Sequence, residues 1–269
     1  MAFQPKVILS TTQDRDAQNC LSEIKKSNLE HIEVSGTFFE SENFASFYSE
    51  VFKAGKNITS VTDIVPANLS RNWASSSESI QNEVRDVLLQ KIALAGRYNI
   101  KYFSFDLGLD AIRAGTEIKE ISLRAKLLES LTPSLKKAGI TLCQPIRFPK
   151  TFPGSEEWRL ATMLVTAVMH ENVCTEINVF PAEVNNSRVG SLLKKTFYTT
   201  KLIRFRYEPA LENKFSADMH TFWAESLKAQ GFTGDLVFTP VVESLDAEKQ
   251  SLDELSLVKN VYLEEAEEL

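Results

Sequence analysis

An alternation of strand-like and helix-like segments, repeated eight times, is the feature that most constrains the fold of this chain. Each strand-like segment is short, rich in β-branched or aromatic residues, and followed by turn residues, which is typical of buried strands. These segments occupy residues 6–11, 31–36, 58–64, 101–107, 140–146, 174–180, 202–208 and 235–240.

Amphipathic segments separate the strand-like ones. Their apolar residues recur at spacings of three and four, which predicts crossover helices. The predicted helices cover residues 17–28, 46–56, 79–99, 122–139, 156–172, 191–200 and 218–231, with one more within 245–269. Ser187 and Asp218 are expected caps near helix starts, and residues 72–79 form the most loop-like stretch, suited to a lid or substrate loop.

Strands that alternate with helices imply βαβ units and a parallel sheet. Eight such units in 269 residues favour a closed (β/α)8 TIM barrel, so we expect one α/β domain over residues 1–269. The stretch STTQDRD after the first predicted strand has no GxGxxG motif, which argues against an open dinucleotide-binding sheet.

Composition excludes several classes of protein. The formal net charge is −6 and the pI about 5.3, so no basic footprint for nucleic acid is expected. No apolar run reaches the length of a membrane span, and MAFQPKVILSTT does not read as a signal peptide. The three cysteines show no metal or redox spacing, so we expect buried free thiols in a cytoplasmic protein.

The seventh predicted strand, within KLIRFRYEP at 201–209, alternates apolar residues with Arg204, Arg206 and Glu208. In a barrel the more apolar face of each strand packs on the helices, so the ionic face is expected to point into the lumen. The same rule turns further polar residues inward: Glu33, Ser35, Ser104, Asp106, Glu176 and Asn178, with Asp63 and Gln144 of ambiguous parity.

Arginines in a barrel lumen need partners, because a guanidinium cannot escape burial by losing its proton. Glu176 is the expected partner of Arg204, with Asp106 or Glu33 across the lumen as further candidates. This ionic group has two interpretations, a plug that holds the barrel together or the floor of a pocket at the C-terminal rim, where barrel enzymes keep their chemistry.

Three stretches carry a resemblance to a known family: IEVSG on the second predicted strand, LAGRYNIKYF before the fourth, and LKKAGITL before the fifth. In their order and spacing, over nearly the whole chain, the segments resemble the xylose isomerase-like barrels of the sugar isomerase/epimerase and endonuclease IV superfamily. The resemblance implies a divalent metal, held by carboxylates and histidine at the ends of strands five to eight, that steadies an enediolate during proton transfer.

The metal-ligand positions that this resemblance implies do not carry suitable ligands. They fall on Gln144 or Pro145, near Asn178, on Arg206, and on Thr239 or Pro240, with Glu243 a few residues later. Amide, guanidinium and proline groups do not replace a carboxylate–imidazole set around a hard cation. His31, His170 and His220 form no cluster, although His220 is close enough to the rim to keep as a candidate. We therefore expect no metal and no other cofactor.

Two functions follow from these residues. In the first, the pocket at the strand ends binds a small sugar, sugar acid or sugar phosphate and interconverts isomers or epimers by proton transfer. The expected substrate-binding residues are Gln144, Arg147, Asn178, Arg206 and Thr239. Glu33, Asp106 and Glu208 are the candidate catalytic bases, provided that enclosure raises the pKa of the one that acts.

In the second, the barrel is degenerate and serves as a binding or assembly module without turnover, and a homo-oligomer remains open in either case. A class I aldolase is disfavoured, because it needs a Schiff-base lysine in the lumen. Lys101 lies at a strand entrance, and no strand interior holds another lysine.

Overall fold

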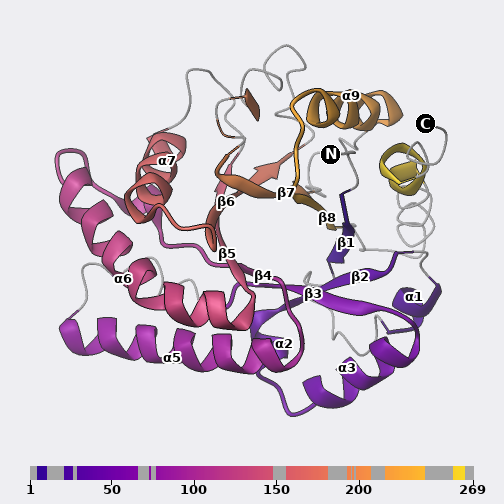
Figure 1. Cartoon of the computed structure of the whole chain (residues 1–269), viewed down its shortest axis with the longest axis horizontal. Coiled ribbons are helices and arrows are strands. Elements are labelled where there is room, and N and C mark those ends of the chain that lie inside the picture. Colours follow the sequence, from indigo (N-terminus) through magenta and orange to yellow (C-terminus); the bar gives the residue numbers. More distant parts are fainter. Residues whose placement is uncertain are drawn as a thin grey trace.

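A closed barrel of eight parallel strands forms the centre of the molecule, with neighbours in sequence order β1 to β8 and β8 pairing back to β1 (Figure 1). The computed structural model describes residues 5–10, 21–26, 29–65, 73, 77–147, 156–180, 193–194, 196, 198–206, 216–239 and 257–263. The predicted TIM barrel is confirmed.

The strands match the predicted ones to within a few residues. They are β1 (Val7–Ser10), β2 (His31–Ser35), β3 (Asn57–Thr62), β4 (Tyr102–Ser104), β5 (Thr141–Arg147), β6 (Val173–Val179), β7 (Thr200–Arg206) and β8 (Asp235–Thr239). The prediction for β4 was too long, because the chain turns soon after Ser104. There Asp106 Oδ1 accepts a hydrogen bond from Gly108 N at 2.8 Å, and Gly108 adopts a left-handed backbone with φ of 63°.

Helices cover the outside of the barrel (Figure 1). They are α1 (Leu21–Lys26), α2 (Gly36–Phe39), α3 (Phe44–Lys53), α5 (Glu78–Arg97), α6 (Glu117–Ala138), α7 (Glu156–Val168) and α9 (Ala217–Ala229), with a 3-10 turn, η2 (Leu109–Ala111), and a helical stretch at 257–262. None of the helices in the described part of the chain combines the length and the apolar character that crossing a membrane requires.

Two expectations about helix ends change. Asp218 is not the cap of α9; Ser216 is, and its hydroxyl accepts from Met219 N. Asp218 instead lies in the first turn, where its charge favours the positive end of the helix dipole. The helix predicted at 122–139 begins at Glu117, and its first turn carries the acidic Glu117 and Glu120 together with an exposed Ile118. Ser187 and nearly all of loop 72–79 before Ser77 lie outside the described residues.

The main core lies between barrel and helices and includes the outward side chains of every strand, such as Val34, Phe103, Ile177, Phe205 and Phe238. A separate six-residue cluster fills the lower lumen: Ile8, Tyr102, Cys143, Cys174, Leu202 and Val237. The inward and outward faces therefore follow the predicted alternation on β2, β4, β6 and β7. Cys143 and Cys174 are buried free thiols, as expected.

Gly36, directly after β2, allows the end of β3 to pack closely against it. A Cβ at this position would collide with the Asp63 carbonyl oxygen and lie 2.7 Å from Ile64 Cα. Asp63 itself has a φ of 52°, a left-handed conformation that aspartate tolerates better than most residues. The Gly36 contact therefore helps to hold the strained turn that places Asp63 at the barrel mouth.

Candidate functional site

The lumen is layered from the apolar cluster at the bottom to a polar pocket at the C-terminal mouth. Below the apolar layer, the Tyr102 hydroxyl donates to Asp235 Oδ2 at 2.8 Å, and Lys101 Nζ pairs with the same oxygen at 2.9 Å. These contacts lie at the N-terminal end of the barrel, the face that serves stability in TIM barrels.

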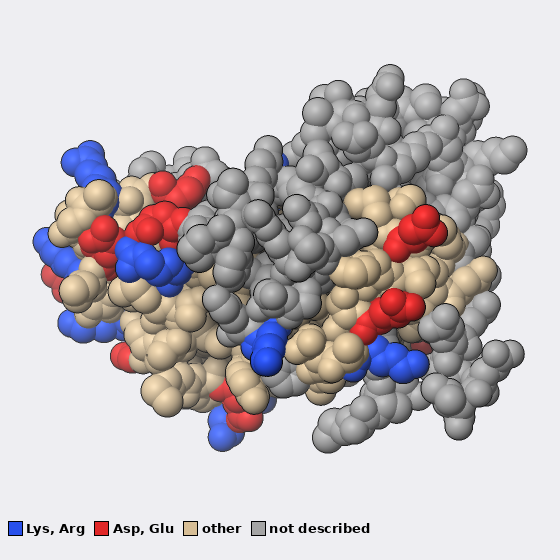
Figure 2. Space-filling view, turned by 90° about the horizontal axis from the view of Figure 1, so that it is seen from above, with Lys and Arg blue, Asp and Glu red and all other residues tan. Residues whose placement is uncertain are grey.

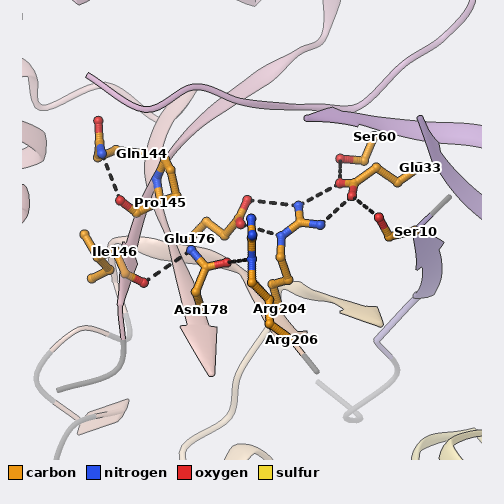
Figure 3. Close-up of polar contacts among 10 residues, drawn as sticks. All are labelled: Ser10, Glu33, Ser60, Gln144, Pro145, Ile146, Glu176, Asn178, Arg204 and Arg206. Carbon is orange, nitrogen blue, oxygen red and sulfur yellow. Dashed lines mark hydrogen bonds and ion pairs between the residues drawn. The ribbon is translucent and has the colours of Figure 1, made fainter. Parts of the chain in front are cut away.

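Above the apolar layer, Arg204 lies between two carboxylates (Figure 3). Its Nε donates to Glu176 Oε1 at 2.6 Å, and its terminal nitrogens donate to both oxygens of Glu33, one of them at 2.7 Å. The hydroxyls of Ser10 and Ser60 also donate to the Glu33 carboxylate, to Oε1 at 2.8 Å and to Oε2 at 2.7 Å respectively. Both carboxylates are fully buried and Arg204 is 1% exposed, so a single guanidinium serves two buried carboxylates as their shared partner. The predicted pairing of Arg204 with Glu176 and Glu33 is confirmed.

Glu33 consequently does not meet the condition set for a catalytic base. Burial alone would raise its pKa, but the charge and hydrogen bonds of Arg204, with those of Ser60 and Ser10, lower it below its usual value. Glu33 is also absent from the lining of the pocket above. Its carboxylate belongs to the ionic layer beneath the pocket. Glu208, the candidate base on the seventh predicted strand, lies outside the described residues.

The pocket at the mouth has a volume of about 300 Å³. It is lined by Asp63, Val65, Ser104, Asp106, Pro145, Arg147, Glu157, Asn178, Phe180 and Arg206. Four predicted site residues, Asp106, Arg147, Asn178 and Arg206, are brought together there. Gln144 and Thr239 are not among the lining residues.

Gln144 has the opposite parity on β5 from the lining residues Pro145 and Arg147. Its Oε1 accepts from Leu107 N at 3.0 Å, and its Nε2 donates to Pro145 O at 2.8 Å and Asp106 Oδ1 at 3.3 Å. The amide is fully buried and joins the end of β4 to β5. The Gln144 amide therefore contacts Asp106 and the backbone around it and does not face the pocket.

Arg206 is the cation at the centre of the mouth. Its Nε donates to Asn178 Oδ1 at 2.8 Å, as Figure 3 shows, and Arg204 lies one layer below. Burial and the neighbouring charge of Arg204 lower the pKa of Arg206, partly offset by Glu176 and Asp63. At the outer wall, the Arg147 guanidinium stacks 4.3 Å from the centre of the Phe180 ring.

Two acidic residues that line the pocket, Asp63 and Glu157, were not among the predicted substrate-binding or catalytic residues. Burial raises the pKa of Asp63, although Arg206 and Arg204 act in the opposite direction. Burial, reinforced by the negative charges of Asp106 and Asp110, raises the pKa of Glu157 to about 7, against a hydrogen bond from the Arg147 backbone. Glu157 lies in the first turn of α7. In the sequence, two glutamates at the start of an amphipathic helix look like an ordinary solvent-exposed first turn, so no local signal marked Glu157 as a pocket residue.

The residues at the strand ends do not fit the divalent metal of the xylose isomerase-like barrels. The inward residues towards the ends of β5 to β8 are Pro145, Arg147, Asn178, Arg206 and Thr239, and the half-buried Arg206 guanidinium repels a cation. Within the described ranges, no group of three or more His, Cys, Asp or Glu side chains is arranged to hold a metal ion.

The histidines also lie away from the pocket. His31 hydrogen-bonds Thr59 at 2.9 Å at the start of β2. His220 is fully buried outside the barrel wall, where its ring packs against Phe205, Phe238 and Tyr262. The candidate at the rim is therefore a core residue.

Comparison with known proteins rests on structure alone, since no family model and no curated protein sequence matches the chain. D-psicose 3-epimerase from Clostridium cellulolyticum H10 superposes with a TM-score of 0.73 at 11% identity, over 96% of this chain and 99% of that one. The chain has the xylose isomerase-like TIM-barrel fold.

Further solved structures agree with this fold. A 3-keto-D-glucoside 4-epimerase from E. coli gives a TM-score of 0.70 at 12% identity, over 96% of this chain and 100% of that chain. A xylose isomerase domain protein from Alicyclobacillus acidocaldarius gives 0.63 at 13%, covering 95% and 98% of the two chains. The resemblance seen in the sequence is thus confirmed at the level of the fold.

Proposed function

We propose that the protein binds a small polyhydroxylated or anionic molecule, a sugar, sugar acid or sugar phosphate, in the pocket at the barrel mouth. The proposed reaction is isomerisation or epimerisation by proton transfer. The observation that carries the proposal is the convergence of Arg206 and Arg147 with the carboxyl groups of Asp63, Asp106 and Glu157 around one cavity of about 300 Å³. Cavities from about this size upward are typical of small-ligand sites.

Each group has a task in such a reaction. A carboxyl group with a pKa near 7 exists in both protonation states at neutral pH, so Glu157 can accept a proton from a carbon next to a carbonyl and return it. The Arg206 guanidinium can stabilise the enediolate oxygen that forms meanwhile. Asp106, held by Gly108 N and Gln144, can orient a substrate hydroxyl.

A second candidate function is binding without turnover. It is favoured by the strand ends, where proline, amide, guanidinium and hydroxyl groups stand in the positions of carboxylate and imidazole ligands. A binding module with this pocket needs the same contacts to ligand but no proton transfer.

A panel of keto- and aldo-sugars, each with and without a phosphate, separates the two functions. Binding is measured by the rise in melting temperature, and turnover by NMR detection of solvent deuterium entering the α-carbon. Exchange that is lost in Glu157→Gln and kept in Glu156→Gln supports the enzyme, because Glu156 is an exposed neighbour paired with Arg159. Stabilisation without exchange supports the binding module, and neither effect with any ligand refutes the proposed function.

A further inference from the structure

Arg206 has unused hydrogen-bonding capacity inside a largely desolvated site. Its only hydrogen bond with the described part of the chain runs from Nε to Asn178 Oδ1. Within the described part of the chain both terminal nitrogens of Arg206 therefore have no hydrogen-bond partner, whereas those of Arg204 are bonded to Glu33 and Glu176. A planar fork with two free N–H edges matches a carboxylate or phosphate group.

The charges around Arg206 strengthen this reading. Arg204 lies one layer below, and the two carboxylates that bond to it, Glu176 and Glu33, also act on Arg206 from that layer. Of the acidic groups that line the pocket, Asp63 is the one whose charge acts on Arg206, and burial disfavours the ionised form of Asp63. Burial and the charge of Arg204 together outweigh these carboxylates and lower the pKa of the half-buried Arg206, so an anionic ligand beside it would offset part of that cost.

A second, independent observation lies beside Arg206. Thr239 is its register partner on β8, so both side chains point to the lumen. Thr239 is 9% exposed as a residue, and its hydroxyl oxygen is buried and has no hydrogen-bond partner within the described part of the chain. Buried hydroxyls are normally bonded, so an orphan next to a free guanidinium indicates a polar ligand or an ordered water.

We propose that Arg206 takes over the electrostatic role of the divalent cation in this barrel, and that the pocket therefore selects a hydroxylated small anion. The terminal nitrogens of Arg206 hold the carboxylate or phosphate group in two parallel hydrogen bonds. Thr239, which lies beside Arg206 without lining the pocket, bonds to a hydroxyl of the same ligand directly or through an ordered water. The inference rests on the proposed function, because it names the substrate class for the same pocket.

Calorimetry at pH 7 with matched ligands tests whether the pocket selects a hydroxylated anion. D-gluconate and D-sorbitol share a six-carbon hydroxylated chain and differ in the charged group, while hexanoate has the charge without the hydroxyls. D-fructose 6-phosphate, D-fructose and inorganic phosphate distinguish a phosphate from a carboxylate. We expect gluconate or fructose 6-phosphate to bind at least about tenfold more tightly than its neutral counterpart, which is the size of one charge-assisted pair.

Variants assign the effect to residues. Arg206→Gln should remove the preference for the anion, and Arg206→Lys should restore it only in part because lysine lacks the fork. Arg85→Gln, an exposed arginine paired with Asp86 on α5, is the control and should bind as the wild type does. Thr239→Val should weaken the hydroxylated anion while leaving hexanoate unchanged.

Stability measurements keep the test interpretable, since Arg206→Gln should unfold no more easily than the wild type. The anion preference should also survive EDTA. A wild-type protein that binds sorbitol or fructose as tightly as the anions overturns the inference but leaves the proposed function standing. Stoichiometric Mn²⁺ or Mg²⁺ required for binding overturns the role of Arg206, and a protein that binds none of the ligands refutes the proposed function itself.

Discussion

Replacing Arg204 by methionine tests the ionic layer on which the pocket rests. The variant keeps much of the side-chain volume but leaves Glu33 and Glu176, both 0% exposed, without their cation. Removing one partner of a buried ion pair costs about 3 to 5 kcal/mol of unfolding free energy at neutral pH. For a chain of this size that corresponds to a fall in melting temperature of about 10 °C.

The pH dependence of this loss distinguishes charge from packing. In the wild type the lowered pKa of Glu33 stabilises the fold above its ordinary value of 4.5, and this contribution is lost as pH falls through the folded pKa. In Arg204→Met only the hydrogen bonds from Ser60 and Ser10 still oppose burial, which is the largest cause, so we expect the pKa of Glu33 to rise above its ordinary value. The folded variant then binds more protons than the unfolded chain, and its stability falls as pH rises from about 4.5.

Urea unfolding of the wild type and Arg204→Met at pH 5 and pH 8 measures both effects. The deficit should be larger at pH 8. Glu33→Gln and Glu176→Gln added to Arg204→Met should recover part of the loss and abolish its pH dependence. A deficit below about 1 kcal/mol at pH 8, or one equal at the two pH values, would refute the view that Arg204 compensates two ionised glutamates.

The remaining predictions concern the pocket rim and the buried thiols. Glu157→Gln should gain stability relative to the wild type as pH rises from 4.5 to about 7, because the raised pKa of Glu157 destabilises the native wild type over that range. Melting temperatures of the two proteins, measured across this pH range, would contradict the prediction if their difference stayed constant. Gly36→Ala should lose about 1 to 3 kcal/mol in urea unfolding, since its Cβ meets the Asp63 carbonyl, and unchanged stability would show that the turn relaxes freely. Cys143 and Cys174 should react with a thiol reagent only as fast as the protein unfolds, because burial raises the pKa of both thiols; mass spectrometry of labelled peptides would expose rapid labelling of either one.

The charges on the outer surface add no comparable constraint. Figure 2 shows Lys and Arg side chains interspersed with Asp and Glu over the described part of one face. Exposed ion pairs among the described residues include Lys53 with Glu50 and Arg159 with Glu156. Exposed pairs contribute little to stability, so the ionic interactions that matter most for this fold lie inside the barrel.

The sequence by itself determined the barrel and the direction of its side chains. Strand alternation is local, with a period of two, so the apolar face of Ile203 and Phe205 had to meet the helices and Arg204 and Arg206 had to turn inward. The need of a buried guanidinium for carboxylates then pointed to Glu176 and Glu33.

Only the tertiary structure decided which polar residues share the pocket. Glu157 belongs to a helix rather than a strand, so its place at the mouth depends on how α7 packs over the barrel. The place of Asp63 depends on a left-handed turn, for which Gly36 at the end of the neighbouring strand leaves room. The pKa of Glu33 is lowered rather than raised because Arg204, 171 positions away, holds its carboxylate. Contacts between residues so far apart in sequence arise from barrel closure, which no local pattern records.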